Sequence, residues 1–165
     1  MSICYIDAFS GLSGDMLVGA LADAGADRDA ITRALESFAI GAKIKWERVH
    51  RRGMVATKFR VVTDESSKHR HLSGVLKLIR AADVPDAVKQ KASRIFEVLG
   101  EAESAVHGID IEKVHFHEVG AVDSICDIVG VSLALEMLGF FSGDLAEGVA
   151  ALKEKRQPTF PHLKK

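Results

Sequence analysis

Apolar residues recur at two different spacings along this chain. Spacings of three and four, which place side chains on one face of a helix, predict five helical segments. They cover residues 16–24, 31–38, 73–82, 85–107 and 123–138. Gly25, Gly108 and Gly139 follow three of them, as expected where a helix ends in a left-handed residue. The first two helices are close in sequence and are expected to run antiparallel.

Alternating and β-branched residues mark the segments expected to be extended. Residues 3–9 predict a short apolar strand, and residues 42–63 predict a β-hairpin whose turn lies at residues 51–53. Residues 64–71 are polar without a period and predict a loop, while residues 111–116 predict a strand or extended segment. The expected fold class is α/β, with α+β as the near alternative: a small sheet, including the N-terminal strand and the hairpin, is covered by four or five helices.

Charge and hydropathy argue against nucleic-acid and membrane partners. The formal net charge is −1, which provides no general attraction for nucleic acid or an anionic membrane. No apolar run approaches the roughly 20 residues that span a bilayer, and the N-terminus does not resemble a signal peptide, so a cytoplasmic location is expected. Cys4 and Cys126 lie in apolar segments outside any CxxC pair. Both are expected to be reduced and buried, without disulfide or metal roles.

The segment His115-Phe-His117-Glu118 is the first candidate for chemistry. In an extended chain, residues two apart share a face, so both imidazoles can face one ion. Asp123 and Asp127, one helical turn apart, would add carboxylates near the start of the following helix. Such ligands suit nickel, manganese or zinc without deciding between them. The structural alternative is that Asp123 caps the helix and the histidines are ordinary surface residues.

The second candidate is the glycine- and serine-rich loop that joins residues 3–9 to the first helix. Small residues before a helix N-terminus leave backbone N–H groups open to a phosphate or another anion. The loop residues expected to bind a cofactor are Ser10, Gly11, Ser13, Gly14 and Asp15. Asp7, at the end of the predicted strand, and Asp15 are also candidates for a cation. The structural alternative is a tight turn in which Ser13 or Asp15 caps the helix.

One Glu–His pair and one pair of histidines stand outside these motifs. Glu103 and His107 lie one turn apart, where an i,i+4 pair at the helix C-terminus explains them without a metal. His69 and His71 lie in the polar loop. They are either transient metal ligands or solvated side chains without a metal.

Three motifs together resemble a known family. Residues 7–16, 102–108 and 114–130 resemble the nickel insertion proteins that complete the nickel pincer nucleotide cofactor of lactate racemase. The motifs stand in the family's order and spacing, and the resemblance covers residues 1–139. It implies a CTP-dependent nickel-inserting lyase, a cyclometallase, that inserts Ni²⁺ into a pyridinium mononucleotide bearing two thiocarboxylate groups. It also implies Mn²⁺ or Mg²⁺ used with CTP, and a lactate racemase-type apoprotein as the later recipient.

Roles within these motifs follow from residue type and position. The resemblance, combined with side-chain chemistry, assigns catalysis to His117, Glu118 and Asp123. The metal ligands expected are His115, His117, Glu118, Asp123, Asp127 and Asp7. The glycine loop would hold the phosphate of the mononucleotide precursor.

The resemblance stops before the C-terminus. We expect residues 1–139 to form a domain of this family's N-terminal type and residues 140–165 to form a divergent tail. Nothing in that tail resembles the family's CTP-binding C-terminal domain, so a truncated, frameshifted or split protein is expected, with a separately encoded partner domain. The rival is a non-catalytic module that binds nickel or holds the cofactor. A metal-dependent hydrolase is a third reading, but its further His and Lys ligands are not apparent.

Overall fold

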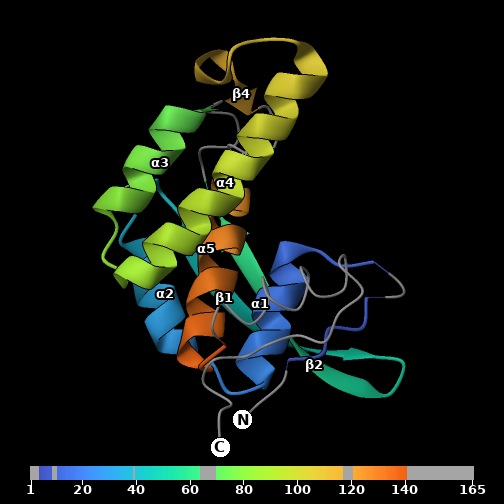
Figure 1. The fold of residues 1–165 in the computed structure, drawn as a ribbon. Helices are drawn as coiled ribbons and strands as arrows, with labels where there is room; N and C mark the ends of the chain where they lie inside the picture. Colours follow the sequence, from blue (N-terminus) through green and yellow to red (C-terminus); the bar gives the residue numbers. More distant parts are fainter. Residues whose placement is uncertain (1–3, 9–10, 39, 64–69, 117–120, 141–165) are drawn as a thin grey trace, which may run out of the picture.

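The structure is a computed structural model that describes residues 4–8, 11–38, 40–63, 70–116 and 121–140 (Figure 1). Its helices are α1 (Gly14–Asp23), α2 (Arg28–Glu36), α3 (Leu72–Ala81), α4 (Asp86–His107) and α5 (Val122–Met137), with a short 3₁₀ helix, η1 (Ile111–Lys113). Its strands are β1 (Lys43–Arg51), β2 (Met54–Val62), β3 (Arg70–His71) and β4 (His115–Phe116). The five predicted helices and the hairpin are therefore confirmed.

Helix α5 forms the centre of the fold. It packs against α1, α2 and α4, and also touches β2 (Figure 1). Its buried positions, among them Ile125, Val129 and Leu133, lie on several sides of the helix. A helix that is apolar around most of its circumference is stable only when other elements cover it, which explains why four elements surround α5.

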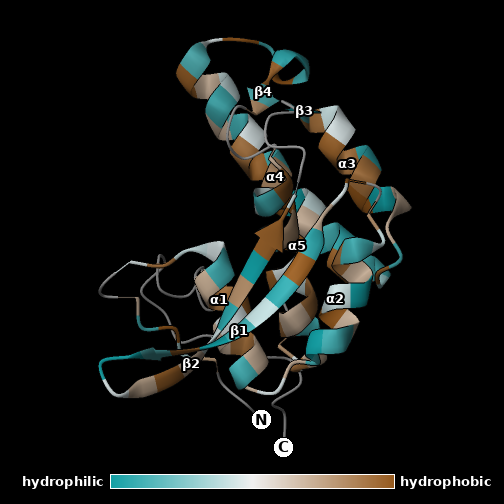
Figure 2. Ribbon diagram, turned by 180° about the vertical axis from the view of Figure 1, so that it is seen from behind, coloured by the Kyte–Doolittle hydropathy of each residue, from teal (hydrophilic) through white to brown (hydrophobic). Residues whose placement is uncertain are grey.

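The hairpin of β1 and β2 lies against the helices on one side (Figure 2). Its strands pair antiparallel from Lys43 opposite Val62 to Arg51 opposite Met54. The two residues between them, Arg52 and Gly53, both have positive φ (47° and 83°), as the favoured two-residue hairpin turns require. The tip of the hairpin extends beyond the helices in the same view.

Helix α1 makes an unusually close approach to β2. A Cβ atom at Gly19 would lie 2.3 Å from the backbone oxygen of Thr57, so no other residue fits there without movement. On the other side of α1, Val18 contacts α5 where Gly130 leaves room. Helix α1 is thus held between the hairpin and the central helix.

A polar cluster fixes the C-terminal end of α1 on β2. The carboxylate of Asp23 accepts hydrogen bonds from the N–H and hydroxyl of Thr57, at 2.8 and 2.6 Å, and from Arg28 at 3.0 Å. The hydroxyl of Thr57 in turn accepts from Arg28 at 2.7 Å. The hydrogen bond from the Thr57 hydroxyl is the main cause that holds the pKa of Asp23 below its usual value. The buried hydroxyl of Thr57 therefore both donates and accepts a hydrogen bond.

The sheet differs from the prediction at the N-terminus. The described residues 4–8 form no strand, and their side chains are exposed, including Tyr5 and Ile6. A short apolar run becomes a strand only where a neighbouring edge accepts its hydrogen bonds, and no described strand pairs with this segment. Cys4 is exposed for the same reason, contrary to the prediction, whereas Cys126 is buried as predicted.

The mixed helix and strand fold is confirmed, in its α+β form. Both described sheets are antiparallel, β1 with β2 and β3 with β4, and helices pack against them. The strands therefore need no crossover connections of the kind that define parallel α/β folds. None of the helices in the described segments is long and apolar enough to cross a membrane.

We predict that Thr57→Val destabilises the domain by about 1.5–3 kcal/mol, because it removes a hydrogen bond to a charged carboxylate while keeping the side-chain shape. Thr32→Val is the matched control, since the Thr32 hydroxyl bonds to the uncharged indole of Trp46 and to a backbone oxygen. Urea unfolding of both variants measures the difference. Equal losses would show that the Asp23 cluster adds no special stability.

Candidate functional site at the junction of α1 and α5

The glycine loop ends at the first turn of α1. Gly11 has a positive φ of 93°, and its N–H donates to the carbonyl of Ala8 at 2.9 Å, which closes a turn before the helix. Ser13 occupies the N-cap position, but its side chain makes no capping hydrogen bond to the backbone. Its hydroxyl instead donates to the carboxylate of Asp15, which also accepts from the N–H of Met16 at 2.8 Å. Asp15 thus compensates the positive end of the helix.

Asp127 of α5 lies directly against this turn. A Cβ atom at Gly14 would lie 2.5 Å from the Cβ and 2.6 Å from the Oδ2 of Asp127, so only glycine leaves room for that carboxyl group. The backbone N–H of Asp15 donates to it. The two sequence motifs, which lie at opposite ends of the domain, therefore meet at one place. We call Gly14, Asp15, Asp123 and Asp127 the acidic junction.

The acidic junction changes the acidity of its innermost carboxyl group. Burial, followed by the nearby charges of Asp15 and Asp123, raises the pKa of Asp127 to about 7, although the hydrogen bond from the Asp15 N–H opposes this. A carboxyl with such a pKa exchanges a proton near neutral pH, which is a common property of catalytic acids and bases. Burial likewise raises the pKa of the neighbouring Cys126 thiol to about 12. Cys126 is therefore a protonated core residue.

The geometry limits how a phosphate can bind to the glycine loop. The N–H groups of Asp15 and Met16 already donate to the carboxyl groups of Asp127 and Asp15. Three carboxyl groups near the helix start would also repel an anion. A phosphate at this place therefore requires a cation between it and the carboxylates, or displacement of Asp127. Binding by the loop residues remains a prediction, and Ser10 lies outside the described residues.

The predicted metal ligands are only partly placed. His117 and Glu118 lie outside the described residues, and Asp7 is exposed in the segment before the loop. His115 is exposed on β4, where it faces His71 of β3. Within the described ranges, no three His, Cys, Asp or Glu side chains are grouped so that they could hold a metal ion. The metal site around His117 thus stays a prediction.

The remaining pair, Glu103 and His107, has the arrangement expected of a helix C-terminus. The His107 Nε2 lies 3.1 Å from a Glu103 carboxylate oxygen, one turn away on α4. Gly108 follows in the left-handed conformation with a φ of 64°. The helical explanation accounts for both residues.

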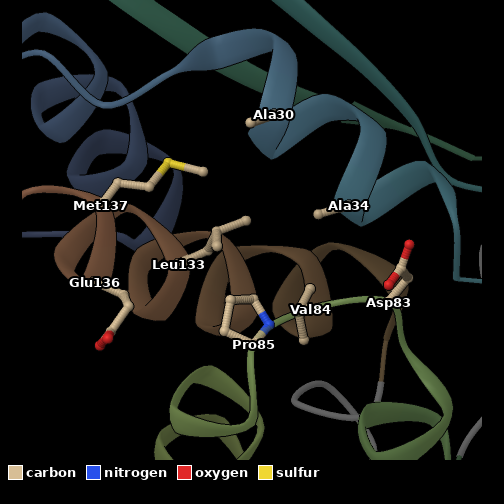
Figure 3. Close-up of a pocket in the computed structure, with 8 residues that line it drawn as sticks. All are labelled: Ala30, Ala34, Asp83, Val84, Pro85, Leu133, Glu136 and Met137. Carbon is tan, nitrogen blue, oxygen red and sulfur yellow. The ribbon is translucent and has the colours of Figure 1, made fainter.

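An apolar cavity of about 270 Å³ lies away from these residues (Figure 3). It is formed between α2, the C-terminal half of α5 and the link from α3 to α4. Its lining residues are Ala30, Ala34, Asp83, Val84, Pro85, Leu133, Glu136 and Met137. None of them belongs to the predicted motifs, and the carboxylate of Glu136 is already paired with Lys91. The cavity is therefore not part of the acidic junction.

Comparison with known proteins identifies the family. Residues 4–150 match the family model described as nickel insertion protein, so the chain belongs to the nickel insertion protein family. This match extends beyond residue 139, and the division of the chain at that point stays a prediction. No solved structure shows a significant match.

Curated relatives carry more specific names. A protein of Geobacillus kaustophilus is 46% identical over 84% of this chain and is named a pyridinium-3,5-bisthiocarboxylic acid mononucleotide nickel insertion protein. A Desulfitobacterium hafniense protein with the same name is 45% identical over 84% of this chain. A Citrifermentans bemidjiense relative, 45% identical over 84% of the chain, is named a putative nickel insertion protein. The chain spans little more than a third of these relatives, between 35% and 37% of their lengths.

We predict that Gly14→Ala destabilises the domain by about 1–3 kcal/mol, because the new methyl group must displace the Asp127 carboxyl group. Gly74→Ala, in the first turn of α3 with no atom within 4 Å of the added Cβ, is the matched control. It should stabilise the domain by up to about 1 kcal/mol. In an Asp127→Gly background, which removes the Asp127 Cβ atom 2.5 Å away as well as the carboxyl group, the cost of Gly14→Ala should fall. An equal loss of stability in both backgrounds would show that the contact with Asp127 is not the cause of the loss.

Asp127 should also make stability depend on pH. Its pKa of about 7 in the folded chain exceeds the ordinary value of 3.8, so its contribution is complete below pH 4 and is lost as the pH rises to about 7. For this partly exposed group, screening limits the change to about 1–2 kcal/mol.

Urea unfolding from pH 4.5 to 8 without divalent ions would test this dependence. The advantage of wild type over Asp127→Asn should shrink, or reverse, as the pH rises. Asp86→Asn, in the first turn of α4 with a side chain 92% exposed, should track wild type. Parallel curves for wild type and Asp127→Asn would contradict the assigned pKa.

Proposed function

We propose that this chain acts in the insertion of nickel into pyridinium-3,5-bisthiocarboxylic acid mononucleotide, the precursor named in two of its relatives. The observation that carries the proposal is the acidic junction, where the glycine loop and α5 bring a proton-exchanging carboxyl to the start of a helix. In a member of this family, such a carboxyl group supports the proposal of a base close to the loop that would bind the precursor.

The chemistry requires a base and a divalent ion. Insertion forms one nickel–carbon bond and nickel–sulfur bonds to the two thiocarboxylates. The carbon–hydrogen bond of the pyridinium ring breaks, its electron pair stays on carbon, and the proton leaves as H⁺. The nickel keeps its oxidation state, so no oxidant is needed. In this proposal a carboxylate of the acidic junction accepts that proton.

The other motif residues complete this scheme. We assign His117, Glu118 and Asp123 to catalysis, and His115, His117, Glu118, Asp123, Asp127 and Asp7 to metal delivery. A cation shared by the phosphate of the precursor, Asp15 and Asp127 would resolve the repulsion at the glycine loop. The precursor would then lie between α1 and α5.

CTP is the further reactant in this proposal. We propose a CTP-dependent lyase in which CTP, with Mn²⁺ or Mg²⁺, binds to a further domain. The nickel-bearing product would pass to a lactate racemase-type apoprotein in the cytoplasm. Since the chain covers little more than a third of its relatives, a module that holds nickel or precursor without inserting the metal is the second candidate.

A reconstitution experiment separates the two candidates. The chain is mixed with Ni²⁺, the precursor, CTP and Mn²⁺, together with the part of the Geobacillus kaustophilus relative that this chain does not cover. Mass spectrometry should detect nickel-bearing product only in the complete mixture. Precursor or nickel bound by this chain, with no product in any mixture, would favour the holding module.

Variants locate the chemistry in the same assay. Asp127→Asn should lower the rate of insertion by about a hundredfold or more, the usual effect of losing a general base. Asp86→Asn should leave the rate unchanged. An unchanged rate in Asp127→Asn would remove the acidic junction from the proposed mechanism.

A further inference from the structure

Two histidines from separate motifs face each other across the β3–β4 ladder. His71 is the direct antiparallel partner of His115, and their ring centroids lie 3.7 Å apart with the planes tilted by 44°. Both side chains are exposed. The sequence paired His71 with His69 and His115 with His117, each within one segment. The structure instead pairs His71 with His115 across two strands.

Buried neighbours hold both histidines in place. His71 is followed by Leu72, whose side chain packs where Gly100 of α4 lacks a Cβ. His115 stands between Val114 and Phe116, which are 0% and 1% exposed. The ring of Phe116 in turn lies 6.0 Å from that of Phe96 on α4. The backbones of the two histidines are therefore fixed by the apolar core, while their rings reach solvent.

This arrangement suits a shared metal ion. Metal–nitrogen bonds of about 2.0–2.1 Å place two nitrogens that bind one ion at right angles about 3 Å apart. Rings 3.7 Å apart can reach that separation by side-chain rotation alone, because the strands are already paired. Imidazole prefers nickel, copper and zinc to magnesium and calcium.

We propose that His71 and His115 together bind one divalent ion of the nickel class at the surface of the β3–β4 ladder. Two protein ligands leave the other coordination positions to water or to an acceptor, so the ion can leave readily. The pair is thus a loading site for nickel, separate from the acidic junction. Its use in loading rests on the proposed function, whereas the binding itself does not.

Calorimetry with Ni²⁺ and Zn²⁺ on the full chain tests the pair. His71→Phe and His115→Phe keep a ring on each strand but remove the metal-binding nitrogens. Each should weaken binding at this site by tenfold or more, and the double variant should lose little beyond either single variant, because both act on one ion. Mg²⁺ should not compete.

His50 provides the matched control. It is an exposed histidine on β1 whose cross-strand partner is Val55, so it has no second imidazole opposite it. His50→Phe should bind Ni²⁺ as wild type does. Thermal unfolding gives a second readout: Ni²⁺ should raise the melting temperature of wild type and His50→Phe, but raise it less in the His71 and His115 variants.

Specific results would overturn the proposal. Unchanged Ni²⁺ affinity in folded His71→Phe or His115→Phe would do so, as would an equal loss in His50→Phe, which indicates scattered surface binding. Nickel binding lost in Asp127→Asn but kept in both histidine variants would move the ion to the acidic junction. The reconstitution assay can fail while this binding persists, so the two proposals fail separately.

Discussion

The tight seating of α1 is the constraint on which the rest of this domain depends. The helix has no side chain at Gly14 or Gly19, the two positions where Asp127 and the backbone of Thr57 come closest. These contacts are too short for any Cβ atom, so α1 can lie between α5 and the hairpin only because both residues are glycines. The helix that begins at the glycine loop is thereby held against both the central helix α5 and strand β2.

The same seating creates an unfavourable electrostatic environment. Packing α1 against α5 partly buries the Asp127 carboxyl group and brings it near Asp15 and Asp123, which raises its pKa. A stable core would gain more from an apolar residue there. Groups whose ionisation is disfavoured in this way often occur at functional sites, since proton transfer near neutral pH requires them. In a member of the nickel insertion protein family, this supports a chemical role for the acidic junction.

The sequence predicted the elements better than their contacts. The periods of apolar residues located five helices and the hairpin, because burial of one face imposes a period directly on a sequence. The strand expected at residues 3–9 is absent from the described residues 4–8, since alternation does not specify a pairing edge. The contact of Gly14 with Asp127 and the pairing of His71 with His115 were not predicted. A close approach and a cross-strand pair depend on tertiary packing and register, for which a single sequence carries no local signal.

The contact between Leu72 and Gly100 connects the exposed histidine pair to the packing of the helices in the interior. Helix α3 begins at the residue after His71, and it packs on α4, the helix that also supports the strand of His115 through Phe96 and Phe116. The approach of α3 to α4 therefore helps to position the two strands whose pairing brings the imidazoles together. A bulkier residue at position 100 would push Leu72 outward and disturb that pairing, although it would touch neither ring.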